Sequence, residues 1–218
     1  MIESIDVNLR VLLEQWHGAP TLPAGPALPE HAWLPPALAE WYALASQWQD
    51  HLITLKEILP PEQIQSEGGV CIFMQDFGDQ AWAFDIAEPT VVLEGQSDGS
   101  WVKSSEGFEE FLVHNAVHDA AYSAPHRRSS TSVPNSLIPD VVSPLQRVNF
   151  GGWHWPRPGH QIFLGKDLIA DIGPAMEDEA PWGNRDGYSE VQVGALSAGR
   201  LDYLDSIDEI SWTRSPLG

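Results

Sequence analysis

Two histidines placed four residues apart, His114 and His118, form the pattern in this sequence best suited to hold a metal ion. At that spacing both imidazoles lie on one face of a helix, as in metalloproteases, whose motif also has a glutamate directly after the first histidine. Asn115 stands there instead, and a third ligand would have to come from Asp119 or His126. We therefore expect two surface histidines, no bound metal and no cofactor.

The remaining chemistry-bearing residues do not form a recognisable catalytic set. The single cysteine, Cys71, lies in an apolar run, which predicts a buried, reduced thiol rather than a nucleophile. The sequence has no glycine-rich phosphate-binding pattern and no G-x-S-x-G pattern of serine hydrolases. In the acidic stretch around residues 178–190, Trp182 stands where a calcium loop needs an oxygen ligand. We expect no catalytic residues, and hence no enzyme.

The aromatic stretch GGWHWPRP, residues 151–158, leaves an alternative open. Trp153, His154, Trp155 and Arg157 suit the stacking of a ligand ring or a sugar, although covering a sheet is the commoner use of such residues. Trp153, His154 and Arg157, together with His160, would line a pocket between a core and a C-terminal lobe. On that alternative the chain is a small-ligand binder or an enzyme.

Charge is the strongest global feature of the chain. Thirty-one acidic residues face eleven basic ones, and residues 1–110 alone hold eighteen acidic against three basic residues, a net charge of −15. Such a surface repels nucleic acid and anionic membranes and attracts basic proteins, although acidity can also serve solubility alone. The N-terminus lacks a signal-peptide pattern and no run is long and apolar enough to span a membrane, so we expect a cytoplasmic location.

Hydrophobic spacing predicts the elements that must position these residues. A helix is expected over residues 3–16, and another begins at Pro36. Short strands then follow one another without intervening helices, and a helix begins near Ser104 or Ser105 as its cap. The expected strands cover residues 70–74, 82–86, 90–94 and 101–103. This order predicts an α+β fold, an antiparallel sheet with helices packed on one side.

The second half of the chain has a different composition. Residues 125–140 are rich in serine and proline, which predicts a linker or a long surface loop after a core of residues 1–124. Residues 141–218 contain short strand-like runs and predict a strand-rich extension, with Ser197 capping a brief helix.

Residues 34–122 resemble the SMI1/KNR4, or SUKH, superfamily. The segments LPPALAEWYALA, GGVCIFMQDFGDQAWAFDI, EPTVVLEG and GSWVKSSEGFEEFLVHNAV carry this resemblance, and its motifs are mainly apolar positions rather than a chemical signature. Glu88 stands before Pro89 where many members have aspartate. The matching positions are Phe73, Asp76, Gly78, Trp82, Pro89, Val91, Trp101, Phe108, Phe111 and Leu112.

The resemblance implies an α+β fold and a binding role. Bacterial members of this superfamily often act as immunity proteins that neutralise toxins, frequently nucleases, whereas eukaryotic relatives are regulatory scaffolds. We therefore predict a protein that binds a basic toxin directly, with a toxin-independent scaffold as a further alternative. Residues in the turns after the strands are the expected contacts. These candidates are Asp76, Phe77, Asp79, Glu88, Glu94 and Asp98.

Overall fold

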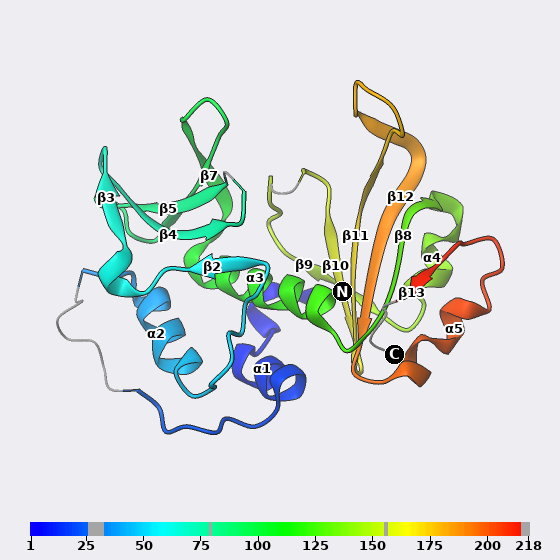
Figure 1. The fold of residues 1–218 in the computed structure, drawn as a ribbon, viewed down its shortest axis with the longest axis horizontal. Coiled ribbons are helices and arrows are strands. Elements are labelled where there is room, and N and C mark those ends of the chain that lie inside the picture. The colour runs from blue at the N-terminus through cyan, green and yellow to red at the C-terminus, as the bar shows by residue number, and fades with distance from the viewer. Residues whose placement is uncertain (26–32, 79, 155–156, 215–218) are drawn as a thin grey trace. The chain divides into compact units, whose positions relative to one another are not determined.

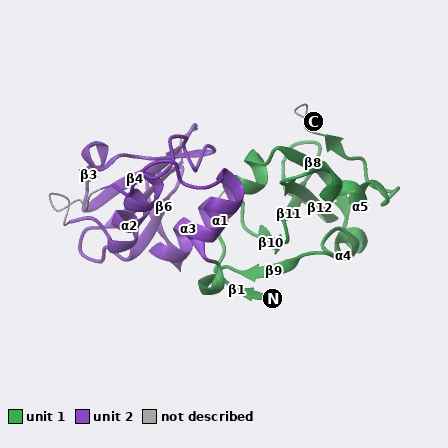
Figure 2. Ribbon diagram, turned by 90° about the horizontal axis from the view of Figure 1, so that it is seen from below, with its two compact units in different colours: residues 1–7, 120–218 green, residues 8–119 purple. Residues whose placement is uncertain are grey.

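The computed structural model describes residues 1–25, 33–78, 80–154 and 157–214 and divides the chain into two compact units (Figure 2). Unit 2 comprises residues 8–119, and unit 1 comprises residues 1–7 and 120–218. Each unit is built around its own sheet. Within the described ranges, no helix has the length and apolar character needed to cross a membrane.

Unit 2 contains an antiparallel sheet with the strand order β2-β4-β5-β6-β7, in which β3 also pairs with β4 (Figure 1). Its helical elements are α1 (Leu9–His17), α2 (Pro36–Ala45), η3 (Pro61–Gln63) and most of α3 (Phe108–Ser123). The strands are β2 (Lys56–Ile58), β3 (Gln65–Glu67), β4 (Val70–Asp76), β5 (Ala81–Asp85), β6 (Val91–Gly95) and β7 (Trp101–Gly107). This arrangement confirms the predicted α+β class.

Aromatic side chains from the β4–β5 hairpin and α3 form the core of unit 2. Phe73 and Trp82 are almost completely buried. The ring of Phe73 packs against Phe108 with 4.7 Å between centroids, and it meets Phe111 edge-on. Such tilted and edge-to-face contacts add to the free energy gained from burying the rings.

The third helix begins later than the sequence indicated. Residues 104–107, expected in the first turn of a helix, continue strand β7, and α3 starts at Phe108. The reason lies in strand alternation, because Ser104 and Glu106 are buried while their neighbours are exposed. Pairing with β6 therefore prevails over the local preference for a serine cap.

Unit 1 contains a sheet with the strand order β1-β9-β10-β11-β12-β8-β13 (Figure 1). The β1–β9 pair is parallel, and the other pairs are antiparallel. The strands are β1 (Ile2–Glu3), β8 (His126–Pro134), β9 (Gln146–Asn149), β10 (Gln161–Gly165), β11 (Leu168–Met176), β12 (Asn184–Ala195) and β13 (Thr213–Arg214). Short helical elements are η1 (Ser4–Asp6), η4 (Asn135–Leu137), α4 (Ile138–Val141), η5 (Ala198–Leu201) and α5 (Asp202–Asp205).

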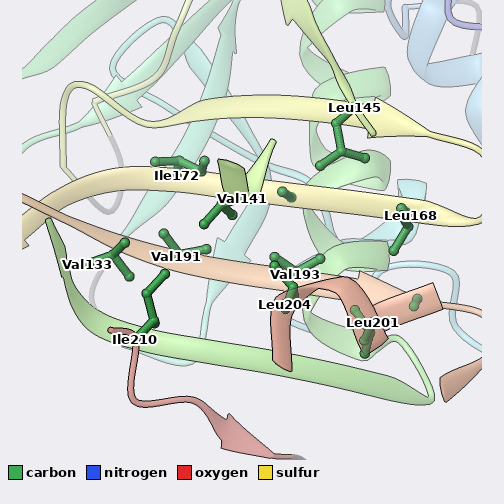
Figure 3. Packing of buried hydrophobic residues seen from close by; sticks show 12 residues of the cluster. Val133, Val141, Leu145, Leu168, Ile172, Val191, Val193, Leu201, Leu204 and Ile210 are labelled. Carbon is green, nitrogen blue, oxygen red and sulfur yellow. The ribbon is translucent and has the colours of Figure 1, made fainter. Parts of the chain in front are cut away.

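One face of this second sheet carries an aliphatic core (Figure 3). Alternate residues of β11 and β12, among them Ile172 and Val193, pack with Val141 of α4 and with Leu201 and Leu204 of η5 and α5. Because these residues alternate along paired strands, the opposite face of the same strands is left for other contacts.

Several predicted boundaries are wrong. Residues 126–134, expected within a linker, form β8, which pairs with both β12 and β13, so long-range pairing outweighs a composition typical of loops. The helix expected over residues 3–16 begins only at Leu9, where the Asn8 side chain accepts a hydrogen bond from the Val11 N–H. Residues 1–7 belong to unit 1 rather than to the first core. Ser197 precedes η5 but makes no capping hydrogen bond through its side chain.

Truncating the aliphatic core should weaken unit 1 specifically. Leu204 is fully buried, so Leu204→Ala is expected to lower the free energy of unfolding by about 2–5 kcal/mol through lost burial and the resulting cavity. Urea unfolding measures this change. The matched control is Met176→Ala. Because the Met176 side chain is 40% exposed, this substitution should lower the free energy of unfolding by much less than Leu204→Ala does. Equal decreases in the free energy of unfolding for the two variants would contradict the packing of Leu204 in this core.

Candidate functional site

Unit 2 contains a buried cluster of ionisable and amide side chains that the sequence did not predict. The strands β2, β6 and β7 contribute to it from the sheet, and α3 contributes from the helix. All of its members are less than 5% exposed. This Lys56 cluster comprises Lys56, Glu94, Glu106, His114, Asn115 and Asp119, and His118 is buried on the same helix.

Lys56 is the cation of this cluster. Its Nζ donates a hydrogen bond of 2.6 Å to Asn115 Oδ1 and lies 5.0 Å from the centroid of the Trp82 ring. Burial lowers the pKa of Lys56 from 10.5 to about 7, and the negative charges of Asp119 and Glu94 only partly oppose this effect. Little in the sequence indicated this burial, since Lys56 is followed directly by the charged residue Glu57.

The two histidines at helical spacing are not at the surface, so that prediction is wrong. His114 is 3% and His118 is 4% exposed, because every residue of α3 from Phe111 to Ala121 is buried. His114 Nδ1 lies 2.7 Å from Glu106 Oε1, within hydrogen-bond distance in the interior. Among the described residues, no group of three or more His, Cys, Asp or Glu side chains is arranged to hold a metal ion.

Asp119 connects α3 to the segment that leads into β2. Its Oδ1 accepts hydrogen bonds from the backbone N–H groups of Thr54 and Leu55 at 2.6 Å and 2.7 Å, and the Thr54 hydroxyl lies 3.2 Å from the same oxygen. Hydrogen bonds from backbone N–H groups to a buried carboxylate are charge-assisted and therefore strong. They fix the backbone next to Lys56.

A cleft of about 760 Å³ opens beside this fixed segment. The end of α2, residues 48–54, β2, the Pro60–Gln63 turn and Phe77 form its walls. Its apolar lining includes Trp41 and Trp48, and its exposed carboxylates are Asp50 and Glu57. A concave, mostly apolar surface with a few polar groups is typical of a binding site.

Phe77 and two of the predicted contact acids lie at one end of the unit 2 sheet. Asp76 ends β4, and its Oδ1 accepts hydrogen bonds from the N–H groups of Gly78 and Gln80. The Gln80 side chain then donates to the Gly95 carbonyl, which ties the β4–β5 turn to the end of β6. Asp98 lies in the adjoining β6–β7 turn and is exposed, and Phe77 is 83% exposed.

The other predicted contacts do not join this group. Glu94 is 1% exposed, because Val92 and Glu94 are the two inward-facing residues of β6, so it cannot be a surface contact. Glu88 is exposed but belongs to the β5–β6 turn, at the opposite end of the antiparallel strands. Asp79 lies outside the described residues.

The sequence predicted that the tryptophan-rich stretch of unit 1 lines a pocket, but its described side chains do not form one wall. Trp153 is buried, His154 is exposed, and Trp155 lies outside the described residues. Arg157 and His160 instead meet at Glu190 of β12. A cleft of about 530 Å³ in unit 1 is lined by neighbouring residues such as Gly159, and its described lining does not include Trp153, His154, Arg157 or His160.

His160 is the centre of an ion-pair network on the sheet face opposite the aliphatic core. Its Nδ1 lies 3.1 Å from both carboxylate oxygens of Asp171, and its Nε2 lies 3.2 Å from Glu190 Oε1. The Tyr122 hydroxyl donates to Asp171 Oδ2 over 3.0 Å, and Arg157 donates to Glu190 Oε1 over 2.8 Å. These residues are separated by up to 68 positions in sequence, and the pairing of β11 with β12 brings Asp171 and Glu190 to the same face of the sheet.

The imidazole of His160 sits over Gly173, where a larger residue does not fit. A Cβ atom at that position would lie 2.4 Å from the ring. Burial alone would lower the pKa of His160, but its contacts with Asp171 and Glu190 prevail and raise the pKa from 6.5 to about 9. An imidazolium has no free lone pair, so His160 is poorly suited to act as a general base near neutral pH.

Cys71 is buried, as expected, and burial raises the pKa of its thiol. A raised pKa reduces the fraction of reactive thiolate. No family model, curated protein or solved structure matches this chain. The resemblance to the SMI1/KNR4 superfamily therefore stays a prediction.

Replacing Asp119 should loosen the segment before β2. In Asp119→Ala the N–H groups of Thr54 and Leu55 lose their acceptor, so the free energy of unfolding should fall by about 2–4 kcal/mol. Hydrogen exchange at these two amides should accelerate. Glu57→Ala removes an exposed carboxylate nearby and serves as the control. Unchanged exchange at both amides would show that Asp119 does not hold this segment.

The contribution of His160 to stability should depend on pH. Because the folded pKa of about 9 lies above the ordinary value of 6.5, its stabilisation is complete below pH 6.5 and is lost as the pH rises through 9. His160→Gln should therefore be on the order of 1–3 kcal/mol more destabilising at pH 6 than at pH 10 in urea unfolding. His154→Gln, at an exposed position, is the control. A pH-independent difference between wild type and His160→Gln would contradict the raised pKa.

Proposed function

We propose that this chain is a non-catalytic protein of the immunity type, which neutralises a basic protein toxin by direct binding. The observation that carries the proposal is Phe77, an 83% exposed aromatic side chain in a turn that the Asp76 carboxylate holds in shape. Aromatic residues on a rigid support are frequent anchors of protein interfaces, because they bury much area at little cost in conformational entropy.

Electrostatics favour a basic partner. Residues 1–110, which contain nearly all of unit 2, have a net charge of −15, and the exposed acids Asp98 and Glu57 lie near the Phe77 end of the sheet. An acidic surface of this kind speeds association with a positively charged protein and discriminates against acidic ones. Nucleases belong to this class of partner, because they bind phosphate through basic surfaces.

The ionisable residues support binding rather than catalysis. His160 has carboxylate contacts at both ring nitrogens, and the Cys71 thiol is buried with a raised pKa. His114 lies within the interior next to Glu106. The resemblance of residues 34–122 to the SMI1/KNR4 superfamily points to the same class of function.

The proposal predicts that partner binding depends on one end of the unit 2 sheet. In capture from the source cells, Phe77→Ser should reduce retention of a basic partner by about tenfold or more, as expected for an interface anchor. Asp98→Lys should weaken retention most at low salt, because salt screens the interaction of an exposed charge with the partner. Co-expression then tests whether the chain suppresses the toxicity of the captured protein.

Two variants serve as matched controls. Trp182→Ser removes an exposed aromatic side chain of unit 1, and Glu88→Lys reverses an acid at the other end of the same sheet. Both should retain the partner as the wild type does. If Glu88→Lys abolishes capture while Phe77→Ser and Asp98→Lys do not, the interface lies elsewhere. A partner without toxicity would favour a scaffold over an immunity protein.

A further inference from the structure

We propose that the 760 Å³ cleft of unit 2 receives a single arginine or lysine side chain, presented by an apolar segment of the partner. This inference rests on the proposed function for its biological meaning, because it names the part of the partner that is recognised. The cleft shares Phe77 with the β4–β5 turn, but its other lining residues lie outside the exposed acidic turns.

The apolar lining of the cleft suits the aliphatic stem of a basic side chain. Trp41 and Trp48 are 5% and 8% exposed, so the cleft reaches down to residues of the core. The indole N–H of Trp48 donates to the Gly18 carbonyl over 2.9 Å and is not available to a ligand. Pro60 and Pro61 add rigid apolar surface. Long basic side chains pack their methylene groups on such surfaces, and their cations are attracted to tryptophan rings.

The charges along the cleft favour a cation over an anion. Asp50 and Glu57 both line it and are both exposed. Lys56 also lines the cleft, but its amino group is buried and donates a hydrogen bond to Asn115 in the interior. His51 is the remaining residue of the lining with an ionisable basic group. An anionic ligand would meet two carboxylates, and a second copy of this chain would bring its own net charge of −20.

The cleft is fixed before a ligand arrives. Asp119 holds the backbone of Thr54 and Leu55, and the Tyr42 hydroxyl donates to the Leu59 carbonyl across the cleft wall. The Gln75 amide donates to Glu57 Oε2 over 3.1 Å and orients that carboxylate. Walls that are already ordered lower the entropic cost of binding a side chain.

A pair of tripeptides tests the inference without knowledge of the partner. The ¹⁵N-labelled full chain is titrated with acetyl-Leu-Arg-Leu-amide and with the same peptide carrying citrulline, a neutral isostere of arginine. The arginine peptide should shift the indole signals of Trp41 and Trp48 and the amide signal of Phe77. The citrulline peptide should bind at least about fivefold more weakly, the equivalent of one charge interaction of about 1 kcal/mol.

Single substitutions locate the charges that matter. Asp50→Asn and Glu57→Gln should each lower the affinity for the arginine peptide by about twofold to fivefold, as expected for exposed carboxylates. Glu88→Gln removes a distant exposed acid and should leave the affinity unchanged. Equal binding of the two peptides, no shifts at millimolar concentrations, or an equal effect of Glu88→Gln would each overturn the inference.

The outcomes separate this inference from the proposed function. If the arginine peptide fails to bind while capture of a basic partner still depends on Phe77 and Asp98, the cleft assignment falls and the function stands. If the peptide binds as expected while no basic partner depends on Phe77 or Asp98, the cleft assignment stands and the immunity proposal falls.

Discussion

Unit 2 depends on the buried carboxylate of Asp119, which accepts two short hydrogen bonds from backbone N–H groups of Thr54 and Leu55. This contact joins α3 to the segment that begins β2, and β2 in turn pairs with β4 beside the Phe77 turn. A buried carboxylate is costly unless it is fully hydrogen-bonded, so the contact restricts the backbone to one arrangement. The cleft takes its shape from that restriction.

The two units place ionisable residues in their interiors with opposite results. For Lys56 the effect of burial prevails and lowers its pKa, whereas at His160 the close contacts with Asp171 and Glu190 prevail and raise it. The difference follows from geometry, since two carboxylates lie within about 3 Å of the imidazole nitrogens. Burial thus prevails at Lys56, whereas close carboxylates prevail at His160.

The features that the proposed function assigns to partner binding lie on the outside of this interior. Asp76 uses its side chain to shape the turn that exposes Phe77, so an acid predicted as a contact acts first as a support. On the proposed function, the exposed acids would supply long-range attraction, and the aromatic residue and the cleft would supply area that excludes water.

Local patterns in the sequence determined much of this protein. The helix beginning at Pro36, the β4–β5 hairpin, its buried Phe73 and Trp82, the α+β class and the acidic surface all follow from spacing and composition within short segments. Such patterns state which residues alternate, but they do not state whether the polar side of an element meets water or another element.

Only the tertiary structure decided the rest. Glu94 is buried because it faces inward from β6, His118 lies in a stretch of α3 in which every residue is buried, and residues 126–134 form a strand because β12 and β13 pair with it. The meeting of His160 with Asp171 and Glu190 likewise depends on the register of β10, β11 and β12. Each of these outcomes depends on contacts between residues far apart in sequence, whose free energies exceed the local preferences of the chain.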